Sequence, residues 1–300
     1  MVQTDPLPDD AAFQPQVLAS RGHEDYALLD SGNGRKLERF GPMLLDRPEE
    51  QAMWAPSLAE KQWQRADAVF TGDVEEEGAG RWRQNANETE WTCRHGALAF
   101  TCRLTSFRHV GVFPEHAVHW NFVEERLKGL EAPKLLNLFG YTGIASLVAA
   151  QAGAQVTHVD ASKKAIAWAR ENQALSGLDD KPIRWLLDDA GKFAAREVRR
   201  GNLYDMILLD PPKYGRGPKG ETWHLFEDLP EMLKLCAQCL KPGGTLILTA
   251  YAIRASYLAL HQLAADIVGG RVTSGEMALL GEGRAKALPT ALYCRAEKPQ

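Results

Sequence analysis

The sequence predicts an α/β protein in which a doubly wound parallel sheet follows a smaller β-rich N-terminal domain. After Pro133, short apolar segments typical of buried strands alternate with longer segments of helical periodicity. Strands that alternate with helices build a parallel sheet through right-handed crossovers, with helices on both faces. The expected strands are residues 134–139, 154–160, 183–189, 204–210 and 243–251.

The division of the chain follows from the same patterns. We expect a flexible arm over residues 1–20, a small β-rich domain over residues 21–106 and the α/β domain over residues 107–300. The arm is polar and proline-rich, with too few large apolar side chains to offset the entropy of ordering. Segments 26–41 and 91–105 have the pattern of β-hairpins, and residues 107–129 change from strand-like to helical at Pro114 and Glu115.

Two further expectations concern the aromatic residues of the first domain and the end of the chain. The first-domain aromatics are expected to pack in a core rather than stack on bases; they are Trp54, Trp63, Phe70, Trp82 and Trp91. Near the C-terminus, residues 255–269 have helical periodicity. Segments 271–280 and 287–296 follow as strand candidates, and an antiparallel hairpin at the sheet edge would fit them.

Bulk composition excludes several classes of protein. A hydrophobic fraction of 45% and a charged fraction of 25% are typical of globular chains. No apolar run is long enough for a membrane span, and the acidic start is unlike a signal peptide, so we expect a cytoplasmic protein without membrane contact. The 5 cysteines have no framework spacing and are expected to be reduced thiols. A net charge of −4 argues against nucleic-acid binding by global charge but allows a local basic patch.

A nucleoside site is indicated at the carboxyl ends of the strands. Residues 140–143 follow the first strand of the α/β domain and precede a helix, so backbone N–H groups face the ligand edge of the sheet. Asp160 ends the next strand, where a carboxylate can accept both hydroxyls of a ribose. Asp189, followed by Ala190, ends the third strand and is our candidate for the contact with the edge of the adenine base. Each acid alone could equally be a helix N-cap, whereas the series favours a nucleoside. A dinucleotide fingerprint needs a third glycine, which is absent here.

A catalytic segment follows the fourth strand of this series. Asp210 is followed by Pro211, Pro212 and Lys213, and consecutive prolines fix the backbone beside the cleft. Fixed acceptors of this kind can position a nucleophile, although a tight turn alone would also use two prolines. The basic, aromatic loop beyond it, with Lys213, Tyr214 and Arg216, could hold a phosphate and stack a base, or could be a solvated loop.

The motifs LLNLFGYTG, LDDA, DPPK and LKPGG, together with Asp160, resemble the class I S-adenosylmethionine-dependent methyltransferases, specifically bacterial 23S ribosomal RNA base methyltransferases, over about residues 107–296. The resemblance implies a Rossmann-like seven-stranded sheet with an antiparallel edge strand and S-adenosylmethionine as cofactor. It implies target-base contacts at residues 210–213. The cofactor contacts that we expect are Phe113, Glu115, Asn137, Phe139, Gly140, Tyr141, Thr142, Gly143, Asp160, Ala161, Asp189, Ala190 and Asp210; the substrate contacts are Lys213, Tyr214 and Arg216.

One departure from that family bears on mechanism. Relatives that make 5-methylcytosine use a cysteine after strand five, where this chain has Thr249, Ala250 and Tyr251. We therefore expect methylation of a nitrogen, most simply on ribosomal RNA, with Asp210 as proton acceptor. A methyltransferase of a small molecule or protein side chain, and a noncatalytic nucleotide-binding module, stay open as alternatives. No RNA-binding module is evident.

No metal site is expected. The pair Cys236 and Cys239 lies in a helical segment without a second ligand pair, so core cysteines are favoured over zinc or redox use. The histidines His109, His116 and His119 are interpreted as packing or substrate-edge residues, because metal pairs usually come with cysteine or acidic partners.

Overall fold

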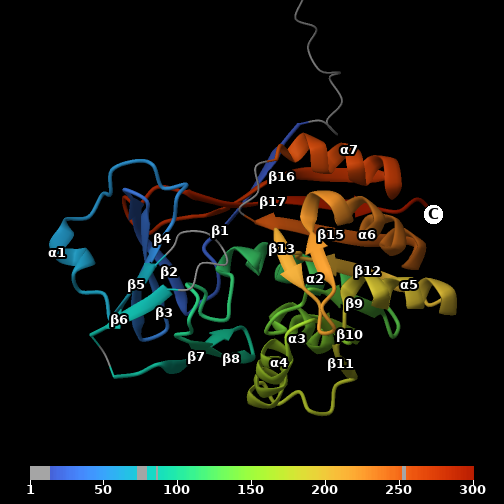
Figure 1. Ribbon diagram of the computed structural model, residues 1–300, viewed down its shortest axis with the longest axis horizontal. Helices are drawn as coiled ribbons and strands as arrows, with labels where there is room; N and C mark the ends of the chain where they lie inside the picture. The colour runs from blue at the N-terminus through green and yellow to red at the C-terminus, as the bar shows by residue number, and fades with distance from the viewer. Residues whose placement is uncertain (1–13, 73–79, 86, 252–254) are drawn as a thin grey trace, which may run out of the picture.

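The computed structural model describes residues 14–72, 80–85, 87–251 and 255–300. A large sheet flanked by helices and a smaller N-terminal sheet lie side by side (Figure 1). The large sheet has eight strands in the order β1-β16-β17-β15-β12-β9-β10-β11, which confirms the predicted α/β class. Their bounds are β1 Gln16–Ser20, β9 Lys134–Leu138, β10 Gln155–Asp160, β11 Ile183–Leu187, β12 Tyr204–Leu209, β15 Leu240–Tyr251, β16 Arg271–Leu279 and β17 Leu288–Glu297.

The C-terminal side of this sheet differs in detail from the expectation. β17 is antiparallel to both β15 and β16, so the antiparallel strand lies inside the sheet rather than at its edge. β1 pairs in parallel with β16 and adds a strand to the seven that the resemblance implied. It consists of the last residues of the expected arm, of which residues 1–13 lie outside the described part. β1 covers the outer backbone edge of β16, which would otherwise present unpaired N–H and C=O groups.

Helices cover both faces of the large sheet, as a doubly wound fold requires. Adjacent residues Leu135 and Leu136 of β9 belong to separate buried clusters, because side chains alternate along a strand. The Leu135 cluster includes α2, α3 and α4, and the Leu136 cluster includes α5, α6 and α7. Their bounds are α2 Ala117–Leu127, α3 Ile144–Gln151, α4 Lys163–Leu175, α5 Ala190–Arg200, α6 Leu225–Cys239 and α7 Tyr257–Ile267.

The N-terminal region is β-rich, with the predicted hairpins in place. A five-stranded sheet has the order β2-β3-β4-β5-β6, and β7 pairs with β8. The turn at Asn33 and Gly34 has φ of 51° and 74°, the left-handed backbone that a two-residue hairpin turn needs. Trp63 and Trp91 are buried, as expected for core packing. The bounds are β2 Tyr26–Gly32, β3 Arg35–Phe40, β4 Met43–Pro48, α1 Glu60–Trp63, β5 Ala68–Gly72, β6 Gly80–Gln84, β7 Glu90–His95 and β8 Leu98–Arg103.

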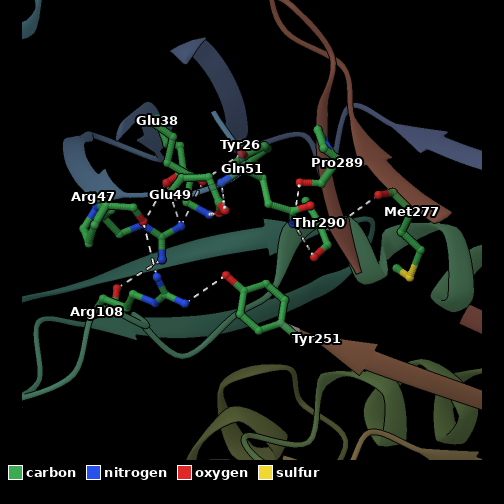
Figure 2. Close-up of polar contacts among 12 residues, drawn as sticks. Tyr26, Glu38, Arg47, Glu49, Gln51, Arg108, Tyr251, Met277, Pro289 and Thr290 are labelled. Atoms are coloured by element: carbon green, nitrogen blue, oxygen red, sulfur yellow. Dashed lines mark hydrogen bonds and ion pairs between the residues drawn. The ribbon is translucent and has the colours of Figure 1, made fainter. Parts of the chain in front are cut away.

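A buried ion pair links this smaller sheet to the segment that leads into the large sheet. The Glu38 carboxylate, 0% exposed, accepts hydrogen bonds from Arg47 at 2.7 and 2.9 Å (Figure 2). The Tyr26 hydroxyl donates to the same carboxylate at 2.8 Å. Arg47 also donates to the carbonyl of Arg108 at 3.1 Å. The charge of Glu38 therefore fixes Arg47, and Arg47 fixes the backbone of the linking segment.

Replacement of Glu38 by glutamine should destabilise the fold strongly. The Glu38→Gln variant leaves the Arg47 guanidinium buried without a charged partner, and breaking a buried pair in this way costs about 3–5 kcal/mol. Urea unfolding would measure the loss. Glu60→Gln is the matched control, because the Glu60 carboxylate is 63% exposed and lies 3.7 Å from Arg35; exposed pairs contribute at most about 1 kcal/mol. Equal stabilities of the two variants would contradict the role given to Glu38.

Candidate functional site

Two adjoining cavities open at the carboxyl ends of the central strands, where ligands bind in open α/β sheets. The main cavity has a volume of about 290 Å³, near the lower end of the range for ligand pockets. A side cavity of about 60 Å³ extends from it. The residues that line both are Phe113, His116, Phe139, Tyr141 and Asp210. The two cavities therefore share a wall and act as one site with a narrow extension.

The loop after β9 borders both cavities and has an unusual backbone. Phe139 and Tyr141 have φ of 58° and 50°, a left-handed conformation that costs a residue with a side chain about 1–3 kcal/mol. Neighbouring elements hold the loop in this shape. The Thr142 hydroxyl donates to the carbonyl of Gly111 at 2.6 Å, and the Asn172 amide donates to the carbonyl of Thr142 at 3.0 Å. The loop is therefore shaped before any ligand arrives.

A buried polar network lies beneath this loop. The Asn137 amide donates to the Ser146 hydroxyl at 3.0 Å, and that hydroxyl lies 3.0 Å from Nδ1 of His158. Burial lowers the pKa of His158 to about 3, so the imidazole is neutral at physiological pH. A side chain at position 140 would collide with His158 and Asn137. Glycine is therefore required at 140 by packing as well as by closeness to the cavity.

Asp160 is positioned to accept hydrogen bonds from a ligand. Its Oδ2 accepts the backbone N–H of Tyr141 at 2.9 Å, and its Oδ1 accepts that of Ser162 at 2.7 Å. Each carboxylate oxygen has a further lone pair, so two adjacent hydroxyls of a ribose can donate to it. Burial raises the pKa of Asp160 above its ordinary value, and the two backbone donors oppose that rise.

The acids after β11 have structural partners as well as a place in the cavity wall. Asp189 is the N-cap of α5 and accepts the N–H of Lys192 at 2.8 Å. Asp188 forms an ion pair with Arg196. Asp188, Asp189 and Ala190 nevertheless all line the main cavity. The N-cap role and the predicted ligand role of Asp189 are thus compatible, because one oxygen serves the helix.

Asp210 stands where the two cavities meet. Burial raises its pKa, the charge of His116 opposes the rise, and the nearby Glu115 adds to it. Oδ2 of Asp210 lies 3.7 Å from Nε2 of His116. The carbonyl of Pro212 accepts the indole N–H of Trp223 at 2.8 Å, which fixes the segment after Asp210. The carboxylate therefore has an imidazole neighbour and a rigid backbone.

Most of the predicted site residues come together in these walls. The structure brings to one or both cavities Phe113, Glu115, Asn137, Phe139, Gly140, Tyr141, Thr142, Asp160, Ala161, Asp189, Ala190, Asp210, Pro211, Pro212 and Arg216. Gly143, Lys213 and Tyr214 line neither cavity. Gly143 instead packs closely against Trp185, and Lys213 is exposed to solvent. Tyr214 begins the short hairpin of β13 Tyr214–Arg216 and β14 Thr222–His224.

The main-cavity side chains that the sequence motifs did not assign include Trp223 and Tyr251, and His116 was interpreted only as a packing or substrate-edge residue. His116 lies in the wall of both cavities, on the short helix Pro114–His116. Trp223 reaches the main cavity from β14, and Tyr251 from the end of β15. The position of Tyr251 at the carboxyl end of a parallel strand was a signal that could have identified it.

The cysteines of the chain lie away from this site. All 5 are buried free thiols, and none of them lines either cavity. Burial raises the pKa of Cys239 to about 11, so this thiol is protonated at neutral pH. In the part of the chain that the structure describes, no cluster of histidine, cysteine and acidic residues could hold a metal ion. No described helix is both long and apolar enough to cross a membrane.

Fold and site together define a nucleoside-binding enzyme of the methyltransferase class, with a buried acid after β10 at the cavity wall and a rigid acid-proline segment after β12. Residues 41–265 match the family described as S-adenosylmethionine-dependent methyltransferase, and the chain belongs to that family. Its cofactor is S-adenosylmethionine.

Known proteins similar to this chain agree with that assignment. A crystal structure of the S-adenosylmethionine-dependent methyltransferase from Agrobacterium tumefaciens is 50% identical, with a TM-score of 0.90 over 94% of this chain and 93% of that chain. The methyltransferase SMU.776, solved in complex with SAH, shares the fold at 16% identity and a TM-score of 0.69 over 91% of this chain and 75% of that chain. The ribosomal RNA large subunit methyltransferase K/L of Pseudoalteromonas atlantica is 35% identical over 49% of this chain but only 20% of its own length. The similar enzyme of Desulfotalea psychrophila is 32% identical over 61% of this chain and 25% of its length. The chain thus spans about a quarter or less of these curated relatives.

The residues present fit this cofactor. S-adenosylmethionine carries a positively charged sulfonium and ammonium group, and its sulfonium supplies an electrophilic methyl group. The main cavity is lined by the acids Glu115, Asp160, Asp188, Asp189 and Asp210, of which Asp188 is paired with Arg196. Acidic side chains in a partly buried cavity favour a cationic ligand, because Coulomb attraction is less screened there than in water.

Loss of the Asp160 carboxylate should remove cofactor binding. The Asp160→Ala variant lacks the acceptor for the ribose hydroxyls, and calorimetric titration with S-adenosylmethionine should show affinity reduced by at least about a hundredfold, the loss of a pair of charge-assisted hydrogen bonds. Wild-type affinity should rise with pH through the raised pKa of Asp160 and level off above it, because only the ionised carboxylate is a full acceptor. Normal affinity in Asp160→Ala would rule out the ribose assignment. Asp180→Ala, on the loop before β11, is the control.

Proposed function

We propose that the protein transfers the methyl group of S-adenosylmethionine to a nitrogen of a nucleic-acid base, most specifically in ribosomal RNA. The observation that carries the proposal is the position of Asp210 at the junction of the two cavities. Asp210 therefore borders the main cavity, which contains both the acids expected to bind the methyl donor and the aromatic side chains that could bind the acceptor. The prolines after it hold the carboxylate in place, and such positioning is the main contribution a protein makes to an in-line transfer.

The aromatic side chains that line the main cavity support a planar acceptor. Phe113, Trp223 and Tyr251 line it beside Pro211 and Pro212. Aromatic and proline rings present flat apolar faces, on which any of the bases can stack. A flexible aliphatic acceptor would gain less from these walls.

Nitrogen as the acceptor atom is supported by the chemistry of the walls. Activation of a pyrimidine carbon needs a thiolate, and the cysteines of this chain are buried away from both cavities. A nitrogen attacks with its own lone pair: the new N–C bond forms as the S–C bond breaks, and the electron pair of that bond stays on sulfur. The nitrogen loses one proton, which Asp210 accepts and His116, 3.7 Å away, can carry onward.

An RNA acceptor is supported by the relatives named as ribosomal RNA methyltransferases and by the loop after Asp210. Arg216 lines the main cavity, and the exposed Lys213 and Lys219 lie on the same loop. Because the net charge is −4, phosphate binding has to come from such a local patch. In this proposal the β-rich domain over residues 21–106 helps to recognise the substrate, residues 107–300 carry out the transfer, and the enzyme works in the cytoplasm.

Asp210→Asn should separate binding from chemistry. The amide keeps the size of the side chain but accepts no proton, so methyl transfer should fall by about 100-fold to 10,000-fold, the usual contribution of a positioned base. Transfer of tritiated methyl from S-adenosylmethionine to protein-free 23S ribosomal RNA measures the rate, and calorimetry should give a cofactor affinity within a few-fold of wild type. Full activity of the variant would exclude Asp210 as proton acceptor. The control is Glu231→Gln on α6, where the carboxylate is exposed to solvent.

RNA binding should depend on salt, and the loop after Asp210 should set part of that dependence. Lys213→Ala and Arg216→Ala each remove one cation that can bind a phosphate, so each should reduce the slope of log affinity against log salt by about 0.7–0.9. Fluorescence anisotropy with a labelled ribosomal RNA fragment measures it. Lys128→Ala, exposed at the end of α2, should leave the slope unchanged. A slope near zero in the wild type would favour the small-molecule or protein side-chain acceptor instead.

A further inference from the structure

Tyr251 occupies a defined place in the acceptor space. It ends β15, at the carboxyl edge of the sheet, and lines the main cavity together with Phe113 and Asp210. Burial raises the pKa of its phenol to about 12. The hydroxyl is therefore protonated at every pH at which the enzyme works, and Tyr251 acts as a neutral aromatic surface with one polar end.

The polar end of Tyr251 is held by Arg108. Nη2 of Arg108 donates to the Tyr251 hydroxyl at 3.0 Å, and the guanidinium carbon lies 5.6 Å from the ring centroid (Figure 2). Arg108 is only 7% exposed. Both contacts fix the direction of the ring, because they act at its oxygen and at its face.

Arg108 is an unusual partner because neutral groups bind its buried charge. Its side chain also donates to the carbonyl of Pro48 at 3.5 Å, and its Nε has no hydrogen-bond partner among the described residues. The neighbouring acids are engaged elsewhere, since Glu38 pairs with Arg47 and Glu49 with Lys36. Keeping a guanidinium buried in this way is costly unless its position serves a purpose.

A series of aromatic rings runs from Tyr251 through His109, which lines neither cavity, to Phe113 in the cavity wall. The His109 ring centroid lies 6.2 Å from that of Tyr251 and 4.8 Å from that of Phe113. Burial and the charge of Arg108 hold the pKa of His109 well below its ordinary value, so this ring is neutral too. Asp210 and Pro211 also line the cavity. The space between these walls suits a flat ring better than a chain.

We propose that Tyr251 is a specificity-determining residue of the acceptor subsite, on whose ring a planar heteroaromatic acceptor stacks, and that Arg108 is the positioning residue that holds this ring. The assignment deepens the proposed function and rests on it for the identity of the acceptor as a nucleic-acid base. Arg108 lines neither cavity, and Tyr251 lines the main cavity without being one of the expected cofactor contacts, so the assignment can be tested apart from cofactor binding.

Two variants test the Tyr251 ring and its hydroxyl separately. Tyr251→Leu removes the stacking surface and should raise the KM for protein-free 23S ribosomal RNA by about tenfold to a hundredfold, the range for loss of one base-aromatic stack. Tyr251→Phe keeps the ring but removes the hydrogen bond from Arg108, so a rise of a few-fold is expected. Both should leave kcat within a few-fold and the calorimetric affinity for S-adenosylmethionine unchanged.

A double-mutant cycle tests whether Arg108 acts through the hydroxyl. Arg108→Met should raise KM at least as much as Tyr251→Phe, because it also removes the contact with the ring face. The double variant should be no worse than Arg108→Met alone, because both changes remove the same hydrogen bond. Tyr26→Phe is the matched control: it removes the hydroxyl that donates to Glu38, in the same buried network, and should lower stability without changing KM. Additive effects of Arg108→Met and Tyr251→Phe would overturn the positioning role. If Arg108→Met does not fold, the KM values of Tyr251→Phe and Tyr26→Phe are compared. A higher KM in Tyr251→Phe alone supports the positioning role, and equal KM values overturn it.

Failure of the proposed function can be told apart from failure of this inference. If the wild type does not methylate ribosomal RNA, the proposed function fails, and the subsite is tested by saturation-transfer NMR. The SAH-bound protein is mixed with millimolar AMP, GMP, CMP or UMP. Saturation transfer to the protons of the base that is lost in Tyr251→Leu and kept in Tyr251→Phe supports the stacking surface. The stacking role of Tyr251 is overturned if the wild type shows no saturation transfer to the nucleotide, or if Tyr251→Leu shows as much as the wild type.

Discussion

The loop after β9 depends on hydrogen bonds that reach it from outside its own strand and helix. Phe139 and Tyr141 are left-handed, and nothing in an isolated strand-loop-helix unit would offset that strain. Thr142 supplies the restraint, because Gly111 accepts from its hydroxyl and Asn172 donates to its carbonyl. The conformation that presents the loop to a nucleoside is therefore a property of the assembled fold.

Buried charge has a related role in the first domain. A buried ion pair such as Glu38 with Arg47 contributes little net stability, since the cost of desolvation offsets much of the attraction. It is directional, however, because the guanidinium makes two bonds to the carboxylate and a third to the carbonyl of Arg108. The pair Lys36 and Glu49, 3.1 Å apart, is buried beside it. These contacts fix where the first sheet sits against the linking segment.

The sequence could predict the elements whose signal is local. Alternating strands and helices predicted the parallel core of the large sheet, and Asp160 and Asp210 could be placed because the carboxyl ends of parallel strands meet at one edge. Residues 16–20 could not be predicted as a strand, since they are largely exposed and gain their pairing only from β16. Likewise, β13 and β14 are three residues each, too short for a periodic pattern.

Within the site, too, residues of a contiguous motif could be predicted, whereas residues brought in by tertiary packing could not. The acid-proline segment and the residues around Gly140 are motifs of consecutive residues, so they could be assigned from the sequence. Trp223 and Tyr251 reach the main cavity from separate elements, and no spacing in the sequence relates them to Asp210. Gly143 shows the opposite case: its motif position suggested a ligand contact, whereas the structure gives it close packing against Trp185.

The first domain contacts the supports of both parts of the proposed site. The backbone of Thr101 in β8 donates to Asn172 at 2.9 Å, and Asn172 in turn holds the loop after β9, which we propose binds the methyl donor. Arg47 in β4 holds the backbone of Arg108, whose side chain bonds Tyr251 in the proposed acceptor subsite. An in-line transfer tolerates little error between donor and acceptor, and a misplacement of about 1 Å can cost about a hundredfold in rate. A shared support keeps that alignment, because a shift of the first domain would move both sides together.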